Sequence, residues 1–279
     1  MSKIITIFSV LFLLTASNIF AQKNNSHFDF KKYISKPSIE LSYGLSELRI
    51  NGNNYNLSNA GMIEMKLGFT KQNVSKYGKN IINYRNNYLF LRNASSDNYS
   101  RSDNPGLSNN MWSFGIGDKE GYGVKTGNFS ILPYSSNSID WTQLTYDQTY
   151  ATPEEIQALA DFDGSFRFGT ATEAGINFQI TQGFSIQPKY EISDVYPRSL
   201  FGKQLMSSVI EYSGLFLIDE FTKQIMKNTP VAGSFVNFVL RNAYEYGFYQ
   251  LRKNQMNWPF TSVAPLRYNT FKLGMTFTF

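Results

Sequence analysis

Apolar and polar residues alternate along much of the chain with a period of two, the spacing of a β-strand with one apolar face. The first such run begins after Pro37, and its apolar positions are Ile39, Leu41, Tyr43 and Leu45. A second run, 63–70, carries charged residues on its polar face, at Glu64 and Lys66. Charge on one face, with no second apolar face, indicates a wet lumen rather than the core of a soluble sandwich.

Two longer alternating runs, 166–180 and 184–192, are joined by residues 181–183. The second run has Lys189 and Glu191 on its polar face. Strands of ten or more residues can cross the hydrocarbon core of a bilayer even when they are tilted. Shorter runs at 88–92 and 112–117 are also expected to be strands, with a long exposed loop between them, and 120–150 holds one or two more.

Two parts of the chain have helical spacing instead. Thr152–Pro153–Glu154–Glu155 predicts a short helix, with Thr152 as N-cap and Glu155 as the acid of a capping box, ending at Asp163–Gly164. Residues 198–240 form a helical insert with a second helix starting at Thr229–Pro230, whereas 244–251 fits a helix and a strand equally. The insert's candidate partner-binding or plugging residues are Leu205, Val209, Phe216, Phe221, Phe235 and Phe238.

The N-terminus has the organisation of an export signal. Lys3 supplies the positive charge and Ile4–Ala16 the apolar region, and the small residue Ala21 marks the expected cleavage point. The apolar run is too short to serve as an uncleaved membrane anchor. We therefore expect a signal peptide over 1–21 and an exposed polar tail over 22–36.

Composition narrows the class of protein. The chain is 42% hydrophobic, 16% aromatic and only 17% charged, with a mean hydropathy of −0.30, whereas soluble domains carry about 25% charged residues. High aromatic content without an apolar helix long enough to span a bilayer is typical of a transmembrane β-barrel. The absence of cysteine from the sequence excludes disulfides, thiolate zinc sites and cysteine nucleophiles.

The last nine residues, 271–279, alternate strictly and end on an aromatic side chain. Lys272, Gly274, Phe277 and Phe279 match the C-terminal insertion signal of Gram-negative outer-membrane β-barrel proteins, which the chain resembles. The resemblance implies that the barrel-assembly machinery reads this strand by strand pairing and that the strand then closes the barrel. The segment Phe20–Ala21–Gln22, with the abundant Asn, Lys and Ile, also resembles exported proteins of Bacteroidota.

These features predict an all-β transmembrane antiparallel β-barrel of about 8–10 strands, with an α-helical insert before the last strands. The chain is expected to have five parts. The signal peptide covers 1–21 and an exposed tail 22–36, and the barrel strands, with loops and a short helix, cover 37–197. The helical insert covers 198–240, and the final barrel segment with its closing strand covers 241–279.

No group of residues has a spacing typical of catalysis. His27, the one histidine, precedes the first strand, so a Ser/His pair would require the tail to fold back. Asp161 and Asp163 lack the spacing of a calcium loop. We therefore expect no catalytic residues, no metal and no cofactor. Glu64, Lys66, Lys189 and Glu191 are expected to face the lumen, where they either plug the barrel or tune permeation.

The leading functional hypothesis is a non-enzymatic integral outer-membrane protein, a structural or accessory subunit of an envelope complex in secretion, uptake or biogenesis. The insert motivates it, because its apolar surface must be buried in the lumen, against the wall, in the membrane interface or on another protein. Alternatives are a narrow passive pore for small solutes and, third, a lipid-acting barrel enzyme. Expected partners are outer-membrane lipids, the barrel-assembly machinery and another protein, while the scattered Lys and Arg argue against nucleic acid.

Overall fold

The computed structural model describes residues 35–50, 57–99, 106–127, 129–149 and 151–279. The expected signal peptide, His27 and nearly all of the expected tail lie outside these residues.

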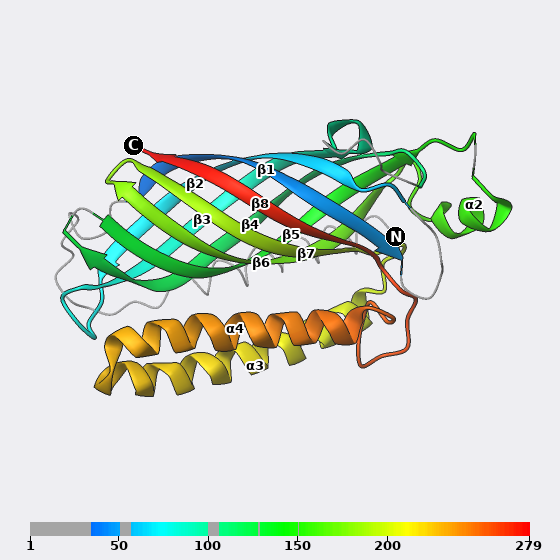
Figure 1. Cartoon of the computed structure of the whole chain (residues 1–279). Coiled ribbons are helices and arrows are strands. Elements are labelled where there is room, and N and C mark those ends of the chain that lie inside the picture. The colour runs from blue at the N-terminus through cyan, green and yellow to red at the C-terminus, as the bar shows by residue number, and fades with distance from the viewer. Residues whose placement is uncertain (1–34, 51–56, 100–105, 128, 150) are drawn as a thin grey trace, which may run out of the picture. The chain divides into compact units, whose positions relative to one another are not determined.

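Eight antiparallel strands form one closed barrel in which each strand pairs with its neighbours in sequence and β8 pairs with β1 (Figure 1). The strands are β1 (Lys36–Ile50), β2 (Ala60–Val74), β3 (Ile81–Ser95), β4 (Asn109–Thr126), β5 (Phe129–Tyr146), β6 (Phe166–Thr181), β7 (Phe184–Val195) and β8 (Leu266–Thr278). The expected antiparallel barrel of about 8–10 strands is confirmed, with eight strands, and the helical insert, expected before the last strands, precedes one strand, β8.

The register gives the barrel a large stagger. Paired residues followed once around the sheet from Ile39 lead back to β1 at Arg49, ten residues further along. A stagger of this size tilts the strands strongly against the barrel axis. Eight strands enclose a space that side chains fill, so the content of the interior decides what the barrel can do.

The two ends of the barrel differ in their connections. At the turn end, short connections such as 75–80 and 182–183 join the strands, and Lys36 lies near Phe279. At the loop end lie the longer connections, which include η2 (Ser96–Asn98) and α2 (Pro153–Leu159). Thr152 and Glu155 form the capping box of α2, as the sequence predicts.

Several boundaries differ from the expectation. The strands β3 and β4 extend well beyond 88–92 and 112–117, so the loop between them is shorter than expected. The insert consists of α3 (Phe201–Asn228) and α4 (Pro230–Arg252), and the expected end at residue 240 is wrong. Tyr244 and Phe248 fit the spacing of a helix and that of a strand, and the structure has a helix here. The helix turns Glu245 and Tyr249 toward the barrel, where both form hydrogen bonds with the wall.

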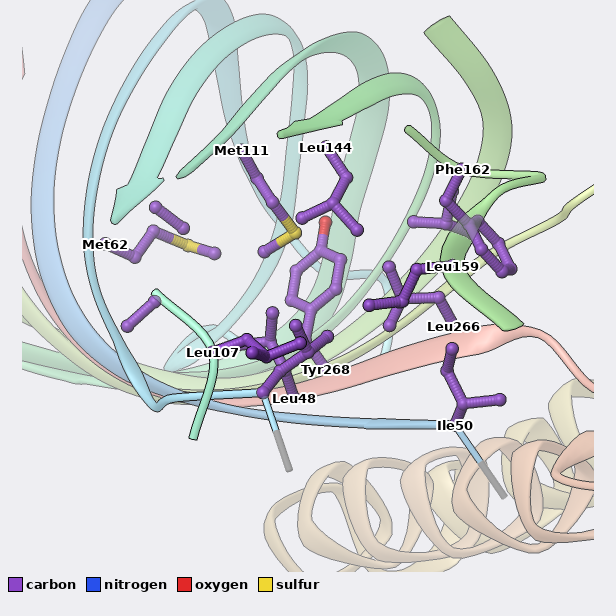
Figure 2. Close-up of a cluster of buried hydrophobic side chains, with 14 residues drawn as sticks. Leu48, Ile50, Met62, Leu107, Met111, Leu144, Leu159, Phe162, Leu266 and Tyr268 are labelled. Carbon is purple, nitrogen blue, oxygen red and sulfur yellow. The ribbon is translucent and has the colours of Figure 1, made fainter. Parts of the chain in front are cut away.

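The polarity of the barrel wall is inverted relative to a soluble protein. On β1 the outward residues are apolar from Ile39 to Leu45, while the inward residues from Ser38 to Ser46 are polar or glycine. Toward the loop end the pattern reverses, because Glu47 and Arg49 point outward and Leu48 and Ile50 point inward. The inward residues there join a hydrophobic cluster that closes the loop end of the lumen (Figure 2).

The helices α3 and α4 form an antiparallel hairpin that packs on the outside of the barrel (Figure 1). Its contacts with the wall come chiefly from α4 against β4, β5 and β6. The possibility that the insert plugs the lumen is therefore wrong, since the lumen is filled by side chains of the strands. Among the described residues, no helix is both long enough and apolar enough to cross a membrane by itself.

Candidate functional site

The barrel interior contains ten buried charged side chains, which we call the lumen network. All of them stand at inward positions of the strands, and none is more than 4% exposed. Five are acids and five are bases, so the formal charges cancel. The members are Glu40, Glu64, Lys66, Arg92, Lys119, Asp140, Glu173, Lys189, Glu191 and Lys272.

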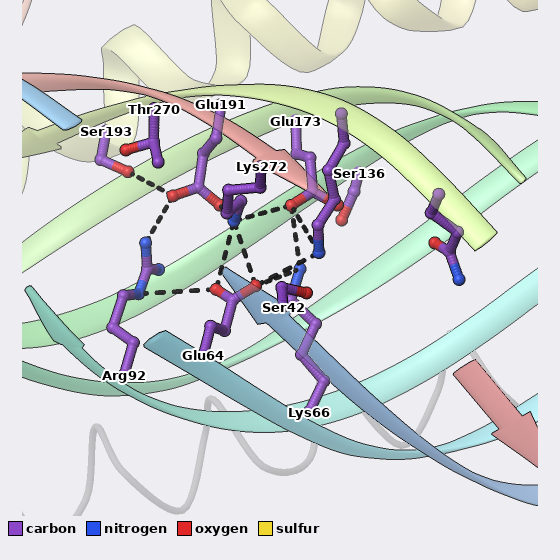
Figure 3. Close-up of polar contacts among 12 residues, drawn as sticks. Ser42, Glu64, Lys66, Arg92, Ser136, Glu173, Glu191, Ser193, Thr270 and Lys272 are labelled. Carbon is purple, nitrogen blue, oxygen red and sulfur yellow. Dashed lines mark hydrogen bonds and ion pairs between the residues drawn. The ribbon is translucent and has the colours of Figure 1, made fainter. Parts of the chain in front are cut away.

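Two carboxylates lie at the centre of the network (Figure 3). Glu64 on β2 lies 3.1 Å from Lys272, 3.3 Å from Lys189, 3.4 Å from Lys66 and 3.8 Å from Arg92. The carboxylate of Glu173 on β6 lies 2.8 Å from Lys272 and 3.0 Å from Lys66. Lys272 therefore joins carboxylates that come from well-separated strands, and the contacts cross the lumen.

The network extends from this centre toward both ends of the barrel. Toward the turn end, Glu40 accepts hydrogen bonds from Lys119, at 2.5 Å, and from Lys189. Toward the loop end, Arg92 donates to Glu191 and, at 3.3 Å, to Asp140. Buried ions are tolerated only when they are paired and hydrogen-bonded, and these contacts supply that pairing.

Tyrosine side chains fill the space around the ions. The Tyr134 hydroxyl donates to Glu173 at 3.1 Å, and the Lys119 ammonium lies 4.9 Å from the centre of the same ring. Lys66 lies 4.5 Å from the centre of the Tyr88 ring. Gly175 makes room for this packing, because a Cβ there would lie 2.4 Å from the Tyr134 hydroxyl. The interior is thus packed as well as neutral.

Apolar clusters flank the network on both sides. The loop-end cluster of Figure 2 includes Met62, Met111 and Tyr268, each at most 1% exposed. A smaller cluster, formed by Ile82, Tyr84, Leu132 and Tyr134, lies toward the turn end. An ion crossing the barrel would have to pass both clusters and separate several buried ion pairs, so the arrangement seals the lumen.

The lumen network contains all four residues that the sequence suggests for the lumen, Glu64, Lys66, Lys189 and Glu191. Lys272, expected as part of the insertion signal, belongs to it too. Alternation misses the other five members, although Glu40 and Glu173 stand on the polar face of clearly alternating runs and could have been found there. Arg92, Lys119 and Asp140 stand near or beyond the ends of the runs that the sequence shows clearly.

The other residues of the expected insertion signal lie apart from the network. Gly274 points inward, where a Cβ would lie 2.9 Å from the Ser42 hydroxyl oxygen. Phe277 and Phe279 point outward at the turn end and are exposed. Phe277 packs against Phe184 of the neighbouring strand, with ring centres 5.3 Å apart.

The apolar residues of the insert do not converge on a site. Phe238 is half-buried, and the remaining candidates are exposed on the hairpin: Leu205, Val209, Phe216, Phe221 and Phe235. Among the described residues, no group of three or more acids and histidines is arranged to hold a metal ion.

A small polar cavity lies outside the lumen, between the wall and the hairpin. Its volume is about 110 Å³, and its lining is Asn83, Arg85, Glu120, Gly121, Tyr122, Asp219, Thr222, Lys223, Asn237 and Arg241. Within it, Arg241 of α4 lies 2.6 Å from Glu120 on the wall and 2.8 Å from Asp219 on α3. The cavity is therefore part of the junction that ties the hairpin to the barrel.

No protein-family model matches the chain, and no curated protein matches it. Similar solved structures include Neisserial surface protein A, 8% identical, with a TM-score of 0.44 over 87% of this chain and 97% of that chain. Ail, the attachment invasion locus protein of Yersinia pestis, is 8% identical, with a TM-score of 0.34 over 88% of this chain and 100% of that chain.

Proposed function

We propose that this chain is an integral outer-membrane β-barrel with a sealed lumen, and that it serves a non-enzymatic, structural role as an accessory subunit of an envelope complex. The observation that carries the proposal is the lumen network, a neutral set of ion pairs that fills the interior. A barrel of this kind offers its outer surface and its loops to its surroundings, and does not offer a passage through its centre.

The polarity of the outer wall supports a membrane location. Large apolar side chains on β2 and β8 are more than half exposed, among them Ile63, Phe69 and Phe271. A contiguous apolar surface of this kind is unfavourable in water and suits hydrocarbon. The charged outward residues Glu47 and Arg49 at the loop end mark where the wall leaves the apolar layer.

The closing strand supports the outer membrane in particular. β8 pairs with β1 along its length, from Ser38 with Thr278 to Ile50 with Leu266, and so completes the sheet. This is the strand whose residues Lys272, Gly274, Phe277 and Phe279 resemble the insertion signal of outer-membrane barrels. We propose that the barrel-assembly machinery engages this strand during insertion, by pairing with its free edge before β1 does.

The sealed lumen also argues against the passive pore, one of the two alternative functions. A passive pore requires a continuous wet path, whereas Lys272 and Glu173 meet at 2.8 Å near the centre of the barrel. A lipid-acting Ser/His enzyme would depend on His27, the one histidine of the sequence, which precedes the first strand. We therefore keep the structural role as the functional proposal.

The location is tested by fractionating a Gram-negative host that expresses the chain and running the fractions on gels with and without heating. We expect the protein in the outer-membrane fraction, with a gel mobility that changes on heating, as a folded barrel gives. A matched variant that lacks residues 266–279, and hence β8, should lose the heat-dependent shift. Recovery of the intact chain from the soluble fraction would contradict the proposed location.

The accessory role is tested separately, by crosslinking intact cells, extracting the membranes with a mild detergent and identifying co-purifying proteins by mass spectrometry. We expect the same envelope protein in independent preparations. A chain that is always recovered alone would refute the role as a subunit and would leave the sealed membrane barrel standing.

A further inference from the structure

On the α3–α4 hairpin, α4 turns its charged side chains inward, and the exposed face of the two helices is mainly apolar. The charged residues within α4 before its last turn are Arg241 and Glu245, and both are buried, as is Arg252 at its end. By contrast, Phe216 on α3 and Val239 on α4 are more than half exposed. A helical hairpin that faced water would show the opposite arrangement.

The buried polar residues of α4 are bound to the barrel wall and to α3. Arg241 bridges Glu120 of β4 and Asp219 of α3. Glu245 accepts a hydrogen bond of 2.9 Å from Asn137 of β5. The hairpin is thus fastened by charged and polar groups rather than by an apolar seam.

The fastening continues toward the loop end. The Tyr249 hydroxyl donates to Thr170 of β6 at 3.1 Å, and the Tyr249 carbonyl accepts a hydrogen bond of 2.6 Å from Arg267 of β8. Between the helices, Arg252 lies 2.7 Å from Glu211 of α3. Contacts of this kind therefore occur along the C-terminal half of α4, from Arg241 to Arg252.

The wall beneath the hairpin is polar, whereas the outward residues of β1 from Ile39 to Leu45 are apolar. Register places Asp118, Asn137 and Thr172 side by side across β4, β5 and β6, all at outward positions. In the adjacent row, Glu120 is paired with Ser135, which is only 3% exposed although it points away from the lumen. We call these five outward residues, Asp118, Glu120, Ser135, Asn137 and Thr172, the polar strip. Ser135 and Thr172 are buried, Glu120 and Asn137 are half-buried, and Asp118 at the edge is exposed. If the hairpin did not cover the polar strip, its polar groups would lie in the hydrocarbon of the bilayer, which costs free energy.

The hairpin extends along the wall between the two ends of the barrel. The helix α3 begins shortly after β7 at the loop end, and α4 returns to β8 there (Figure 1). Between the helices, Pro230 lies near Gly78 in the β2–β3 connection at the turn end, since a Cβ on Gly78 would come within 3.9 Å of it. The hairpin therefore covers the same height as the apolar layer of the bare strands.

The dimensions of the exposed face match that layer. On α3, the exposed charged residues are Lys203 near its start and Glu220 and Lys227 near its end. The residues between Lys203 and Glu220 that are exposed carry no charge. At 1.5 Å per residue this stretch rises roughly 25 Å, the height of the apolar band of an outer-membrane barrel, about 25 Å.

We propose that α3–α4 is an intramembrane hairpin whose exposed face contacts the acyl chains of the bilayer and whose polar face binds the polar strip of the barrel. The inference rests on the proposed membrane location. Neither helix is apolar enough to cross a membrane alone, and the barrel supplies the partners that their polar side chains need. The lipid-facing surface of the protein is then formed by bare strands on one side and by the hairpin on the other.

The natural absence of cysteine from the sequence provides the test. Single cysteines at Phe216 and Val239 are labelled with a nitroxide in the full-length protein, which is folded into vesicles of dimyristoylphosphatidylcholine. Collision rates with oxygen, which partitions into hydrocarbon, and with a water-soluble nickel complex are measured by electron paramagnetic resonance. Leu67→Cys on the bare wall is the lipid control, and Glu47→Cys at the loop end is the water control. Heat-dependent gel mobility verifies that each variant is folded.

We expect the labels at Phe216 and Val239 to match that at Leu67, with oxygen access several-fold above nickel access. Labels at these two positions that behave like the one at Glu47, while Leu67 reports lipid, would overturn the hairpin proposal alone. Labels at Phe216 and Val239 that are shielded from both oxygen and nickel would also overturn the hairpin proposal, because protein rather than lipid would then cover the exposed face of the hairpin. Nickel access at Leu67 as high as at Glu47 would instead contradict the proposed membrane location.

Discussion

Replacing Glu64 by glutamine is the sharpest perturbation of the lumen network. The substitution keeps the shape of the side chain and removes one negative charge from a set of five acids and five bases. Lys272, Lys189 and Lys66 all lie within 3.4 Å of the carboxylate and lose a partner together. The interior, which excludes water, is then left with one uncompensated positive charge.

The expected cost follows from the burial of these groups. Removing one member of a buried ion pair destabilises a protein by about 3–5 kcal/mol, because the remaining charge stays desolvated. Glu64 is essentially unexposed, so solvent does not screen the loss. We therefore expect Glu64→Gln to lower the free energy of unfolding by about 3–5 kcal/mol. The barrel should stay closed, because the apolar clusters at either end of the network are untouched.

The assay is urea unfolding of the protein folded into lipid vesicles, followed by heat-dependent gel mobility. Met65→Leu, on the outward neighbour of Glu64, is the matched control and should change stability by less than about 0.5 kcal/mol. The double variant Glu64→Gln/Lys66→Met restores neutrality, so its cost should fall short of the sum of the single costs by about 0.5–3 kcal/mol. A Glu64→Gln protein as stable as the parent, with additive double-variant costs, would refute the role given to the network.

Three further substitutions test other parts of the molecule. Arg241→Met should leave Glu120 and Asp219 unpaired and make the hairpin susceptible to added protease while the barrel stays folded; unchanged digestion kinetics would count against the junction described. Leu67→Arg should lower the free energy of unfolding in vesicles by about 2–4 kcal/mol, because it puts a charge among acyl chains; an unfolding midpoint equal to that of the parent would argue that this face meets water. Phe279→Ala should reduce the amount of folded barrel in cells several-fold and hardly alter the stability of the folded protein, since the side chain is exposed; equal amounts in a quantitative blot would speak against its part in insertion.

The clearly alternating strands could be predicted from the sequence, because their polar residues face the lumen and their apolar residues face outward. At Ile39–Leu45 and at Phe271–Phe279 every second residue is apolar, and that alternation is a property of the strand alone. It also indicates the lumen charges on clearly alternating strands, such as Glu64 and Lys189. It does not show which of these charges meet across the barrel, because that depends on the number of strands and their stagger.

The middle strands are harder to predict because their outward faces are not uniformly apolar. Asp118, Glu120, Ser135 and Asn137 interrupt the alternation on β4 and β5. The interruption has a physical cause, since the hairpin covers much of this part of the wall. A strand whose outward face packs against a helix rather than lipid lacks the regular apolar residues by which a transmembrane strand is predicted from sequence.

The hairpin itself was only partly predictable. Helical spacing predicts a helical insert over 198–240, but the polar residues Arg241 and Glu245 are equally typical of a face turned toward water. Only the structure shows that they face the barrel, at Glu120 and Asn137. The burial of these groups depends on a partner surface that lies elsewhere in the sequence.

Ion conductance across a planar bilayer distinguishes a membrane barrel with a sealed lumen from one with an open lumen. The protein is first folded into vesicles and verified as folded by its heat-dependent gel mobility, and the vesicles are then fused with the bilayer. We expect a current equal to that of the protein-free bilayer, because Glu64, Glu173 and their lysine partners fill the interior. Reproducible discrete conductance steps that scale with the amount of folded protein would contradict it.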